Sequence, residues 1–398
     1  MTTYTVTVVG VGLQGTAAVY DLAAQPDIAR IWAVDVRDDA LRALQARVPS
    51  PKVQPLLASA EDEAALRPAL QSSQGLLALT PPAQRAALAR WAVAYGLHYV
   101  DASYPIPEIF ALAEAAAARQ VALVPEVGLD PGLDLLLSQR LLVGLDAVHT
   151  WHVYGAGIPA PEAAQPPLRY KISWTWEGVL RAYRRPARLV QHGQVIEVPG
   201  DALFAPGTCT SVTVPELGPL DAYPNGDVLP YLHDAGLLNQ VTHAGRFSLR
   251  WPGHCALWYP WVQAGLLREE PVLLDGHAVE PWRCLARLLE PQLHYGPHER
   301  DLALVRVEVY GWRDRRPVRR IAQVLDYRDL RTGLFAMQRT VGFTAAIVLA
   351  ALVRGQIRGR GLLRPLRDVP AAVVLTALAQ RGIRVHEVEM PWEPGEAS

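Results

Sequence analysis

Three glycines near the start of the chain have the spacing of a dinucleotide-binding turn. Gly10, Gly12 and Gly15 follow an apolar run at 5–9 and precede an Ala-rich stretch. Gly10 permits a tight turn, Gly12 leaves room for a pyrophosphate, and Gly15 allows close packing of the following helix against the strand. That helix offers free N–H groups to phosphate oxygens. The segment predicts a dinucleotide site; a buried glycine turn in another α/β protein is the alternative.

An acidic residue ends the second expected strand. Asp35 lies 20 residues after Gly15, where a carboxylate accepts hydrogen bonds from ribose hydroxyls and repels a 2′-phosphate. This favours NAD over NADP, although Arg37 would soften the choice. The expected cofactor-binding residues flank this turn and the ends of the strands: Gly10, Gly12, Leu13, Gln14, Gly15, Asp35, Val36, Thr80, Pro81, Ser103, Glu126, Val127 and Gly128.

Three residues are the candidates for catalysis. Arg250 lies in a strand-like segment, and its planar guanidinium would bind a substrate carboxylate bidentately, whereas a surface ion pair is the alternative. Asp130 follows the last strand of the first domain, where it would hold a substrate ammonium, exchange a proton, or cap a helix that starts at Pro131. Tyr104 would donate a proton or line the cofactor pocket.

Four further residues are expected to bind substrate, each with a structural alternative. His254 lies close to Arg250 in sequence, and Lys171 lies in a period-two pattern that also suits a cross-strand ion pair. Asn225 precedes Gly226 in a sequence that equally favours a turn. Thr340 lies near the start of an apolar helix, where the dipole favours an anion, or where it caps the helix.

Residues 1–125 alternate short apolar runs with Ala- and Leu-rich segments. Strands are expected over 5–9, 31–36, 53–57, 76–79, 98–100 and 121–125, and helices over 16–24, 40–47, 62–70, 83–95 and 109–119. Such alternation is typical of a doubly wound parallel sheet with helices on both faces. Ligands of such sheets bind beyond the carboxyl ends of the strands, where Thr80, Ser103 and Glu126 lie.

The pattern changes near Leu129 and again near Met337. A helix is expected over 131–142, followed by strands over 148–154, 170–176, 195–198, 247–251 and 304–310. Helices are expected over 337–353 and 371–380, with a short extended tail. The expected fold is α/β. It has a Rossmann domain over 1–128, an α+β substrate-binding and dimerisation domain with a mixed sheet over 129–334, and C-terminal helices over 335–398 that return to the Rossmann domain.

Composition bounds the class of protein. The 398 residues exceed one ordinary core, so two domains are expected. With 38 Lys plus Arg against 39 Asp plus Glu, the net charge of −1 gives no general electrostatic reason to bind nucleic acid or an anionic membrane. The first arginine is Arg30 and the apolar run over 341–353 is short. We therefore expect no secretory signal, no membrane span and a cytoplasmic location.

The cysteines and histidines give no clear metal signature. Cys209, Cys255 and Cys284 lie far apart without a CxxC pair, so free thiols are expected rather than a disulfide framework or a zinc site. The spaced histidine pairs lack an evident third ligand, so no metal is expected.

Several sequence blocks occur together in one known enzyme family. They are GVGLQG at 10–15, DASY at 101–104, PEVGLDPGLD at 125–134, PLRYKISWTWEGVL at 167–180, AYPNGD at 222–227, LRWPGH at 249–254, ERDLALVRV at 299–307 and MQRTVGFTAA at 337–346. On these blocks the chain resembles the saccharopine dehydrogenase family, in the branch of saccharopine reductases and lysine 6-dehydrogenases. GLDPGLD and DASY are similar to the reductases and LRWPGH to the 6-dehydrogenases, while Leu135 departs from the histidine usual in the reductases.

The resemblance implies hydride exchange between a nicotinamide and the carbon of an amine or imine, and it strengthens the assignment of Arg250. We expect an NAD(P)-dependent oxidoreductase acting on lysine or a lysine-derived secondary amine such as saccharopine, with the substrate in a cleft between domains. The alternatives are a carboxynorspermidine-type polyamine reductase, a non-catalytic NAD-binding or redox-sensing protein, and an assembly protein that uses its Trp-rich sheet. The expected partners are the amino-acid substrate and a second copy in a homodimer.

Overall fold

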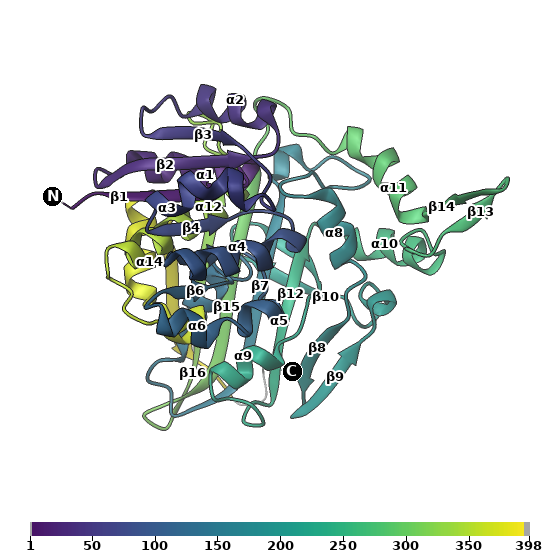
Figure 1. Cartoon of the computed structure of the whole chain (residues 1–398). Helices are drawn as coiled ribbons and strands as arrows, with labels where there is room; N and C mark the ends of the chain where they lie inside the picture. The colour runs from purple at the N-terminus through teal and green to yellow at the C-terminus, as the bar shows by residue number, and fades with distance from the viewer. Residues whose placement is uncertain (1, 394–398) are drawn as a thin grey trace. The chain divides into compact units, whose positions relative to one another are not determined.

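A computed structural model describes residues 2–393, which divide into two compact units (Figure 1). Among these residues, unit 1 comprises 2–140 and 337–385, and unit 2 comprises 141–336 and 386–393. The C-terminal helices therefore return to the N-terminal unit, as the sequence predicts.

Unit 1 contains a seven-stranded parallel sheet with the order β17-β6-β5-β4-β1-β2-β3. Its strands are β1 (Tyr4–Val9), β2 (Ile28–Asp35), β3 (Val53–Leu57), β4 (Gly75–Ala78), β5 (His98–Asp101), β6 (Ala122–Val124) and β17 (Gly361–Leu362). Its helices are α1 (Leu13–Ala24), α2 (Asp38–Arg47), α3 (Glu63–Ser72), α4 (Pro82–Tyr95), α5 (Pro107–Phe110), α6 (Ala113–Ala118), α7 (Leu133–Leu142), α12 (Ala336–Val353), α13 (Pro365–Asp368) and α14 (Ala371–Gln380). The strand order reverses between β1 and β4, which is where such sheets bind nucleotides.

The central strands of unit 1 are buried on both faces. Val6 and Val8 of β1 are fully buried, as is Thr7 between them. This explains the continuous apolar runs, because helices cover both faces of a parallel sheet. By length and composition α12 could cross a membrane, so the expectation that its apolar run is too short is wrong. However, 83% of this 18-residue helix is buried inside the chain, which is typical of a core helix.

Unit 2 contains a nine-stranded mixed sheet. Seven of its strands follow the order β10-β11-β12-β7-β15-β16-β18, with β8 pairing β12 and β9 pairing β8. Its strands are β7 (Ala147–Pro159), β8 (Ala187–Gln191), β9 (Gln194–Val198), β10 (Thr210–Val214), β11 (Gly218–Pro224), β12 (His243–Arg250), β15 (Asp301–Arg313), β16 (Arg316–Tyr327) and β18 (Val385–Pro391). Its helices are α8 (Trp176–Ala182), α9 (Leu229–Asp234), α10 (His254–Gln263) and α11 (Pro281–Leu289). Strands β7 and β12 are parallel, whereas β15 runs antiparallel to β7 and β16.

One expected strand of unit 2 is wrong. Residues 170–175 are irregular, and α8 begins at Trp176. The alternation of apolar residues arises because Tyr170 and Trp176 pack into an aromatic core cluster. The backbone meets no strand edge there: the Ile172 N–H bonds the Leu293 carbonyl oxygen of an irregular segment. The apolar residues therefore alternate in the sequence, but the buried ones are Tyr170, Ser173 and Trp176, so the burial does not follow the period of a strand.

The expectation of free thiols is also wrong for two cysteines. Cys209 and Cys255 form a disulfide across 46 residues of sequence, and only Cys284 is free among the described residues. Their pairing depends on β11 and β12, which bring the start of β10 to the start of α10. Sequence spacing carries no sign of that pairing.

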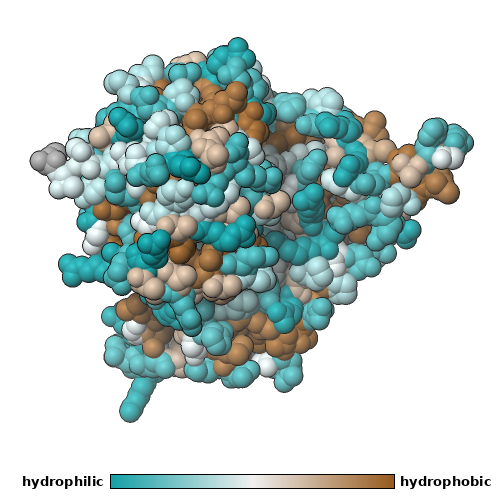
Figure 2. Space-filling view, in the orientation of Figure 1, coloured by the Kyte–Doolittle hydropathy of each residue, from teal (hydrophilic) through white to brown (hydrophobic). Residues whose placement is uncertain are grey.

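A separate two-stranded hairpin extends from unit 2 beside α11 (Figure 1). It consists of β13 (Val272–Leu274) and β14 (His277–Val279), which pair only with each other. Leu273 and Leu274 are 80% and 62% exposed, and a hydrophobic patch is visible at this end of the molecule in Figure 2. An isolated hairpin with exposed leucines has little intrinsic stability in water.

Candidate active site

The glycine-rich turn of unit 1 has the geometry of a phosphate cradle. Gly10 has φ +87°, and a Cβ there would lie 2.4 Å from the Leu79 carbonyl oxygen. A Cβ on Gly15 would lie 1.9 Å from the Gly10 carbonyl oxygen, whereas one on Gly12 would meet nothing within 4 Å. Gly10 and Gly15 are therefore required by packing, while Gly12 borders open space. No side chain caps α1, so its N-terminal N–H groups fit a pyrophosphate.

Asp35 braces this turn from the end of β2. Its Oδ2 accepts the Val11 N–H at 2.9 Å and its Oδ1 accepts the Arg37 N–H at 3.0 Å. A carboxylate accepts about four hydrogen bonds, so two positions are left for ribose hydroxyls. Val36 follows, with a side chain that is 60% exposed, as suits a residue that would cover an adenine ring.

The loops after β4 and β6 hold the other expected cofactor residues. Thr80 lies between β4 and α4, and its buried hydroxyl has no hydrogen-bond partner among residues 2–393, which fits a ligand. Glu126, expected at the cofactor, has φ +64° and is 1% exposed. Its carboxylate forms an ion pair with Arg364 at 3.0 Å and its N–H bonds the Ser103 carbonyl oxygen. The side chain of Glu126 thus contacts the C-terminal segment of unit 1, and its backbone fixes Ser103.

Asp130 does not begin a helix. The Asp130–Pro131 peptide bond is cis, and α7 starts only at Leu133. The interpretation of Asp130 as the N-cap of a helix starting at Pro131 is therefore wrong. Instead, Asp134, which is fully buried, accepts the Gly132 N–H at 2.6 Å and holds the loop in place. Asp130 itself is half-buried in this loop beyond β6. The Val127 N–H connects the loop to β5 through the Asp101 carbonyl oxygen, and the Gly128 N–H bonds the Pro131 carbonyl oxygen within the loop.

A buried ion pair that sequence reasoning did not single out positions Tyr104. Asp101 ends β5 and is fully buried, and its Oδ1 lies 3.4 Å from the Arg85 guanidinium. Burial raises the pKa of Asp101 to about 6, although Arg85 and the Ser103 N–H oppose the rise. Arg85 also donates to the Tyr104 carbonyl oxygen at 2.7 Å, so the loop after β5 is fixed through its backbone. The sequence signal was the acid of the DASY block.

The start of α12 lies against the glycine-rich turn. Gln338 donates to the Leu13 carbonyl oxygen at 2.9 Å, and a Cβ on Gly342 would lie 2.5 Å from the Gln14 carbonyl oxygen. Thr340, on the second turn of α12, is fully buried, and its hydroxyl bonds the Met337 carbonyl oxygen at 3.4 Å. These contacts confirm the expectation that the C-terminal helices return to the Rossmann domain.

Arg250, at the end of β12, lies in an aromatic pocket of unit 2. Its guanidinium carbon is 5.4–5.9 Å from the ring centroids of Tyr170, Tyr183 and Tyr223. Its Nε donates to the Tyr183 hydroxyl at 3.4 Å, and its Nη1 donates to the Leu249 carbonyl oxygen at 2.9 Å. Arg250 is 7% exposed. Within the described part of the chain, no carboxylate forms an ion pair with it.

Tyr170 and Tyr183, beside Arg250, are protonated at neutral pH. Burial raises the pKa of Tyr170 and of Tyr183, although the Arg250 charge opposes the rise. Their hydroxyls and rings therefore contribute hydrogen bonds and ring faces but no counter-charge. The Arg250 guanidinium is therefore one positive charge surrounded by aromatic rings.

His254 forms another side of this pocket. It is the first residue of α10, is 4% exposed, and its ring stacks on Tyr223 with centroids 6.1 Å apart. Burial, with the charge of Arg250, lowers the pKa of His254 well below its usual value. Its Nε2 is buried and has no hydrogen-bond partner among residues 2–393. The structure thus places His254 with Arg250 as the sequence predicts, as a neutral ring.

The other two expected substrate residues of unit 2 already have protein partners. Lys171 pairs with Glu299 at 2.5 Å and donates to the His294 carbonyl oxygen at 3.2 Å. Asn225 accepts a hydrogen bond from Arg185 at 2.6 Å and precedes Gly226, which has φ +78°. Lys171 thus forms an ion pair, but not the cross-strand pair of its structural alternative, because residues 170–175 are irregular and Glu299 precedes β15. Asn225 lies in irregular backbone between β11 and α9, with a bend at Gly226. Neither residue is among the described contacts of Arg250.

Two family models match almost the whole chain. "Saccharopine dehydrogenase NADP binding domain" matches residues 6–124, and "Saccharopine dehydrogenase C-terminal domain" matches residues 128–383. A solved structure, apo saccharopine dehydrogenase (L-Glu forming) from Saccharomyces cerevisiae, superposes with a TM-score of 0.84 at 22% identity. It covers 97% of this chain and 100% of that chain, which shows a shared fold.

Two curated proteins illustrate the relatives. "Alpha-aminoadipic semialdehyde synthase" from Arabidopsis thaliana is 26% identical over 388 residues, which cover 78% of this chain and 36% of that protein. "Saccharopine dehydrogenase [NADP(+), L-glutamate-forming]" from Schizosaccharomyces pombe is 24% identical over 396 residues, which cover 82% and 86%. The chain thus spans little more than a third of the Arabidopsis relative but most of the Schizosaccharomyces one.

Proposed function

The chain belongs to the saccharopine dehydrogenase family, and we propose that it is an NAD(P)-dependent amino-acid dehydrogenase that transfers hydride at a C–N bond. Its substrate is lysine or a lysine-derived secondary amine such as saccharopine. The names of the relatives support this class of reaction, and the glycine cradle of unit 1 supports a pyridine nucleotide.

The observation that carries the proposal is the environment of Arg250. A buried guanidinium without a carboxylate partner is costly, because its charge is removed from water and only tyrosine rings and two hydrogen bonds compensate. A ligand carboxylate would supply the missing charge and bidentate hydrogen bonds. Every α-amino acid carries such a group, so the pocket suits an amino-acid substrate.

The chemistry divides among the cofactor and this chain's own residues. A bound nicotinamide would supply or accept the hydride. Arg250 holds a substrate carboxylate, and the neutral His254 offers a hydrogen bond beside it. Asp130, on the loop beyond β6, takes or returns the proton of the amine, since a carboxylate is the natural partner of an ammonium. Thr80 and the α1 N-terminus bind and orient the nucleotide.

We further propose that the chain prefers NAD to NADP. The argument is Asp35, whose carboxylate lies at the end of β2 and would repel a 2′-phosphate. The matching family model is named for NADP, and the Schizosaccharomyces relative is named for NADP(+). Arg37, whose side chain is 63% exposed, is the residue of this chain that would favour NADP. The preference is therefore a balance between these two charges.

The experiment is the formation of reduced nicotinamide by purified protein with NAD or NADP. The substrates are L-lysine, L-saccharopine, carboxynorspermidine and several ordinary amino acids. We expect turnover of lysine or saccharopine, and ammonia release would distinguish the lysine reaction. Turnover of carboxynorspermidine alone would replace the proposal by a polyamine reductase, and nucleotide binding without any turnover would favour a sensor.

We also propose that the chain forms a homodimer through the β13–β14 hairpin. Leu273 and Leu274 expose apolar surface on a hairpin without neighbouring strands, and a second copy would cover it. Sedimentation of the wild type and of a Leu273→Glu/Leu274→Glu variant tests this. An unchanged dimer in the variant would place the interface elsewhere.

A further inference from the structure

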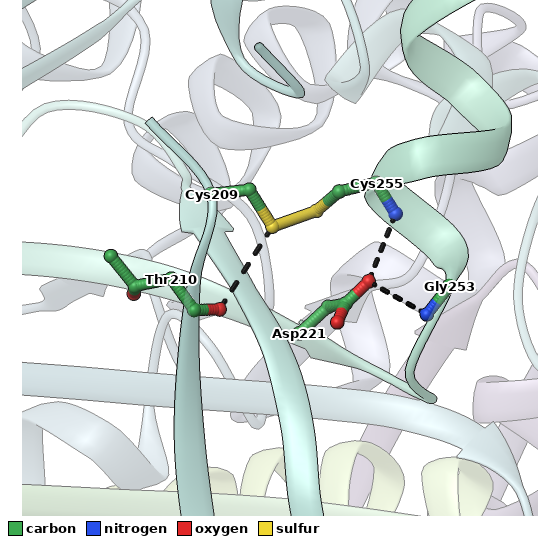
Figure 3. The surroundings of a disulfide bond; sticks show 5 residues. All are labelled: Cys209, Thr210, Asp221, Gly253 and Cys255. Atoms are coloured by element: carbon green, nitrogen blue, oxygen red, sulfur yellow. Dashed lines mark hydrogen bonds between the residues drawn. A yellow bond between two sulfur atoms is a disulfide. The ribbon is translucent and has the colours of Figure 1, made fainter. Parts of the chain in front are cut away.

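The disulfide of unit 2 joins two segments next to the Arg250 pocket (Figure 3). Cys209 is half-buried just before β10, and Cys255 is the second residue of α10, directly after His254. The Cys209 sulfur also lies 3.9 Å from the Thr210 carbonyl oxygen. The half-buried cysteine gives a small reductant access to the bond.

A carboxylate lies beside the two sulfur atoms. Asp221, on β11, accepts the N–H groups of Gly253 and Cys255 with one oxygen, at 3.1 and 3.0 Å. It therefore caps α10 from outside the helix. Its other oxygen has no hydrogen-bond partner among residues 2–393. Figure 3 shows this carboxylate beside the disulfide.

These three side chains have the composition of a transition-metal site. The two sulfur atoms and an oxygen of Asp221 lie within 4.8 Å of one another. Zinc takes thiolate sulfur at about 2.3 Å and carboxylate oxygen at about 2.0–2.2 Å, in tetrahedral geometry. Small side-chain rotations would bring the three ligands to such distances once the sulfur–sulfur bond is broken. Water would take the fourth position.

The surroundings also favour negatively charged sulfur. Cys255 is in the first turn of α10, where the helix dipole stabilises an anion. One oxygen of Asp221 accepts hydrogen bonds from the N–H groups of Gly253 and Cys255 at the start of α10. The helix therefore stays capped whether the cysteines are oxidised or reduced. Neither the dinucleotide cradle nor the contacts of Arg250 use these three side chains.

We propose that Cys209, Asp221 and Cys255 form a redox-gated zinc site. In the oxidised chain the cysteines form the disulfide. A phosphine supplies two electrons and takes the oxygen atom of one water molecule to become a phosphine oxide, while the two protons of that water convert the cysteine sulfurs into two thiols. A dithiol supplies the two electrons and its own two protons, and becomes a disulfide. One Zn²⁺ then displaces the two thiol protons and is held by two thiolates and the Asp221 carboxylate. In both states a covalent or coordinate link joins β10 to α10.

Cobalt substitution tests the proposal on the full chain without reference to activity. The protein is reduced with a phosphine, and the phosphine is then removed under nitrogen. The reduced protein is titrated with Co²⁺, because cobalt–thiolate complexes show a sulfur-to-metal charge-transfer absorption. We expect one Co²⁺ per reduced chain, displaced stoichiometrically by Zn²⁺, and no such absorption in the oxidised chain. A Cys284→Ser variant, which changes only the exposed free cysteine, should behave like the wild type.

The variants separate the site from adventitious binding. Cys209→Ser and Cys255→Ser should each abolish the charge-transfer band, and Asp221→Asn should weaken Co²⁺ binding by at least tenfold while retaining some thiolate absorption. Circular dichroism must show each variant folded. Should one fail to fold, iodoacetamide protection by Zn²⁺ in the reduced wild type replaces it. Reduced wild type that binds no Co²⁺, or binds it equally after Cys209→Ser, would overturn the proposal.

Discussion

The two binding regions are built in opposite ways. The nucleotide cradle of unit 1 is mostly backbone: Gly10 and Gly15 allow close approaches, and Asp35 fixes N–H groups 24 residues back and two residues ahead. The Arg250 pocket of unit 2 is mostly side chain, with Tyr170 and Tyr183 from segments 67 or more residues away. A site made of backbone groups has a contiguous sequence motif. In a site assembled from side chains of distant segments, only the charged residue can be recognised from the sequence.

The sharpest contrast within the cradle is between two glycines. Gly15→Ala would put a Cβ 1.9 Å from the Gly10 carbonyl oxygen, so we expect loss of folding of unit 1, or a destabilisation of about 3 kcal/mol or more. Gly12→Ala would meet nothing within 4 Å. It should leave the Tm within about 2 °C of the wild type. It should nevertheless weaken nucleotide binding at least tenfold. Differential scanning calorimetry measures the Tm of each variant, and fluorescence titration with NADH measures its nucleotide affinity. An equal loss of Tm in Gly12→Ala and Gly15→Ala would contradict the different roles of the two glycines.

The corresponding test of unit 2 removes its charge. Arg250→Met keeps much of the side-chain volume but removes the guanidinium that would bind the substrate carboxylate. We expect a loss of about 100-fold in kcat/KM, because a hydrogen bond to a charged group is worth about 1.5–3 kcal/mol. Nucleotide affinity should stay unchanged. Arg283→Ala, a change on the exposed face of α11, is the matched control. A loss confined to nucleotide binding would place Arg250 outside the substrate site.

Acid should destabilise unit 2 through His152, a half-buried histidine on β7. Burial lowers the pKa of His152 to about 4, with the Glu308 carboxylate opposing and His243 adding to the shift. The unfolded chain binds the proton from about pH 6.5 downward, so stability present at pH 7 is lost as the pH falls. Between pH 7 and pH 5 this amounts to about 1–2 kcal/mol. Urea unfolding of the wild type and of His152→Gln at several pH values measures this loss. If the free energy of unfolding of both proteins fell equally with pH, His152 would not be its cause.

The smallest expected effect is on cofactor choice. Asp35→Asn keeps an oxygen for the Val11 N–H and removes the charge that repels a 2′-phosphate. The ratio of kcat/KM for NAD to that for NADP should fall about tenfold, or about 1.4 kcal/mol. Arg37→Ala should move the ratio the other way. A ratio that Asp35→Asn leaves unchanged would remove the charge argument for NAD.

The extent of sequence-based prediction follows from the same contrast. Six of the seven strands of unit 1 are predicted within a few residues, because strands of a parallel sheet appear as continuous apolar runs. The two-residue strand β17 is not predicted, whereas α12 is predicted as one long apolar helix. In unit 2 the sequence predicts a strand over 170–176, which is wrong for the irregular segment 170–175, because the alternating apolar residues pack against an aromatic cluster instead of forming a sheet. Arg250 was found through its chemistry. The surrounding tyrosines, the Asp101–Arg85 pair and the Cys209–Cys255 bond depend on contacts that no local pattern encodes.

The central claim is that Arg250 binds the carboxylate of the substrate. The direct measurement compares wild type and Arg250→Met, each with the active amino acid and with its carboxamide analogue. The wild type should lose about 100-fold in kcat/KM on amidation, because a buried guanidinium is left without its anion. Arg250→Met should accept acid and amide within about threefold of each other. A variant that discriminates against the amide as strongly as the wild type would show that another residue binds the carboxylate.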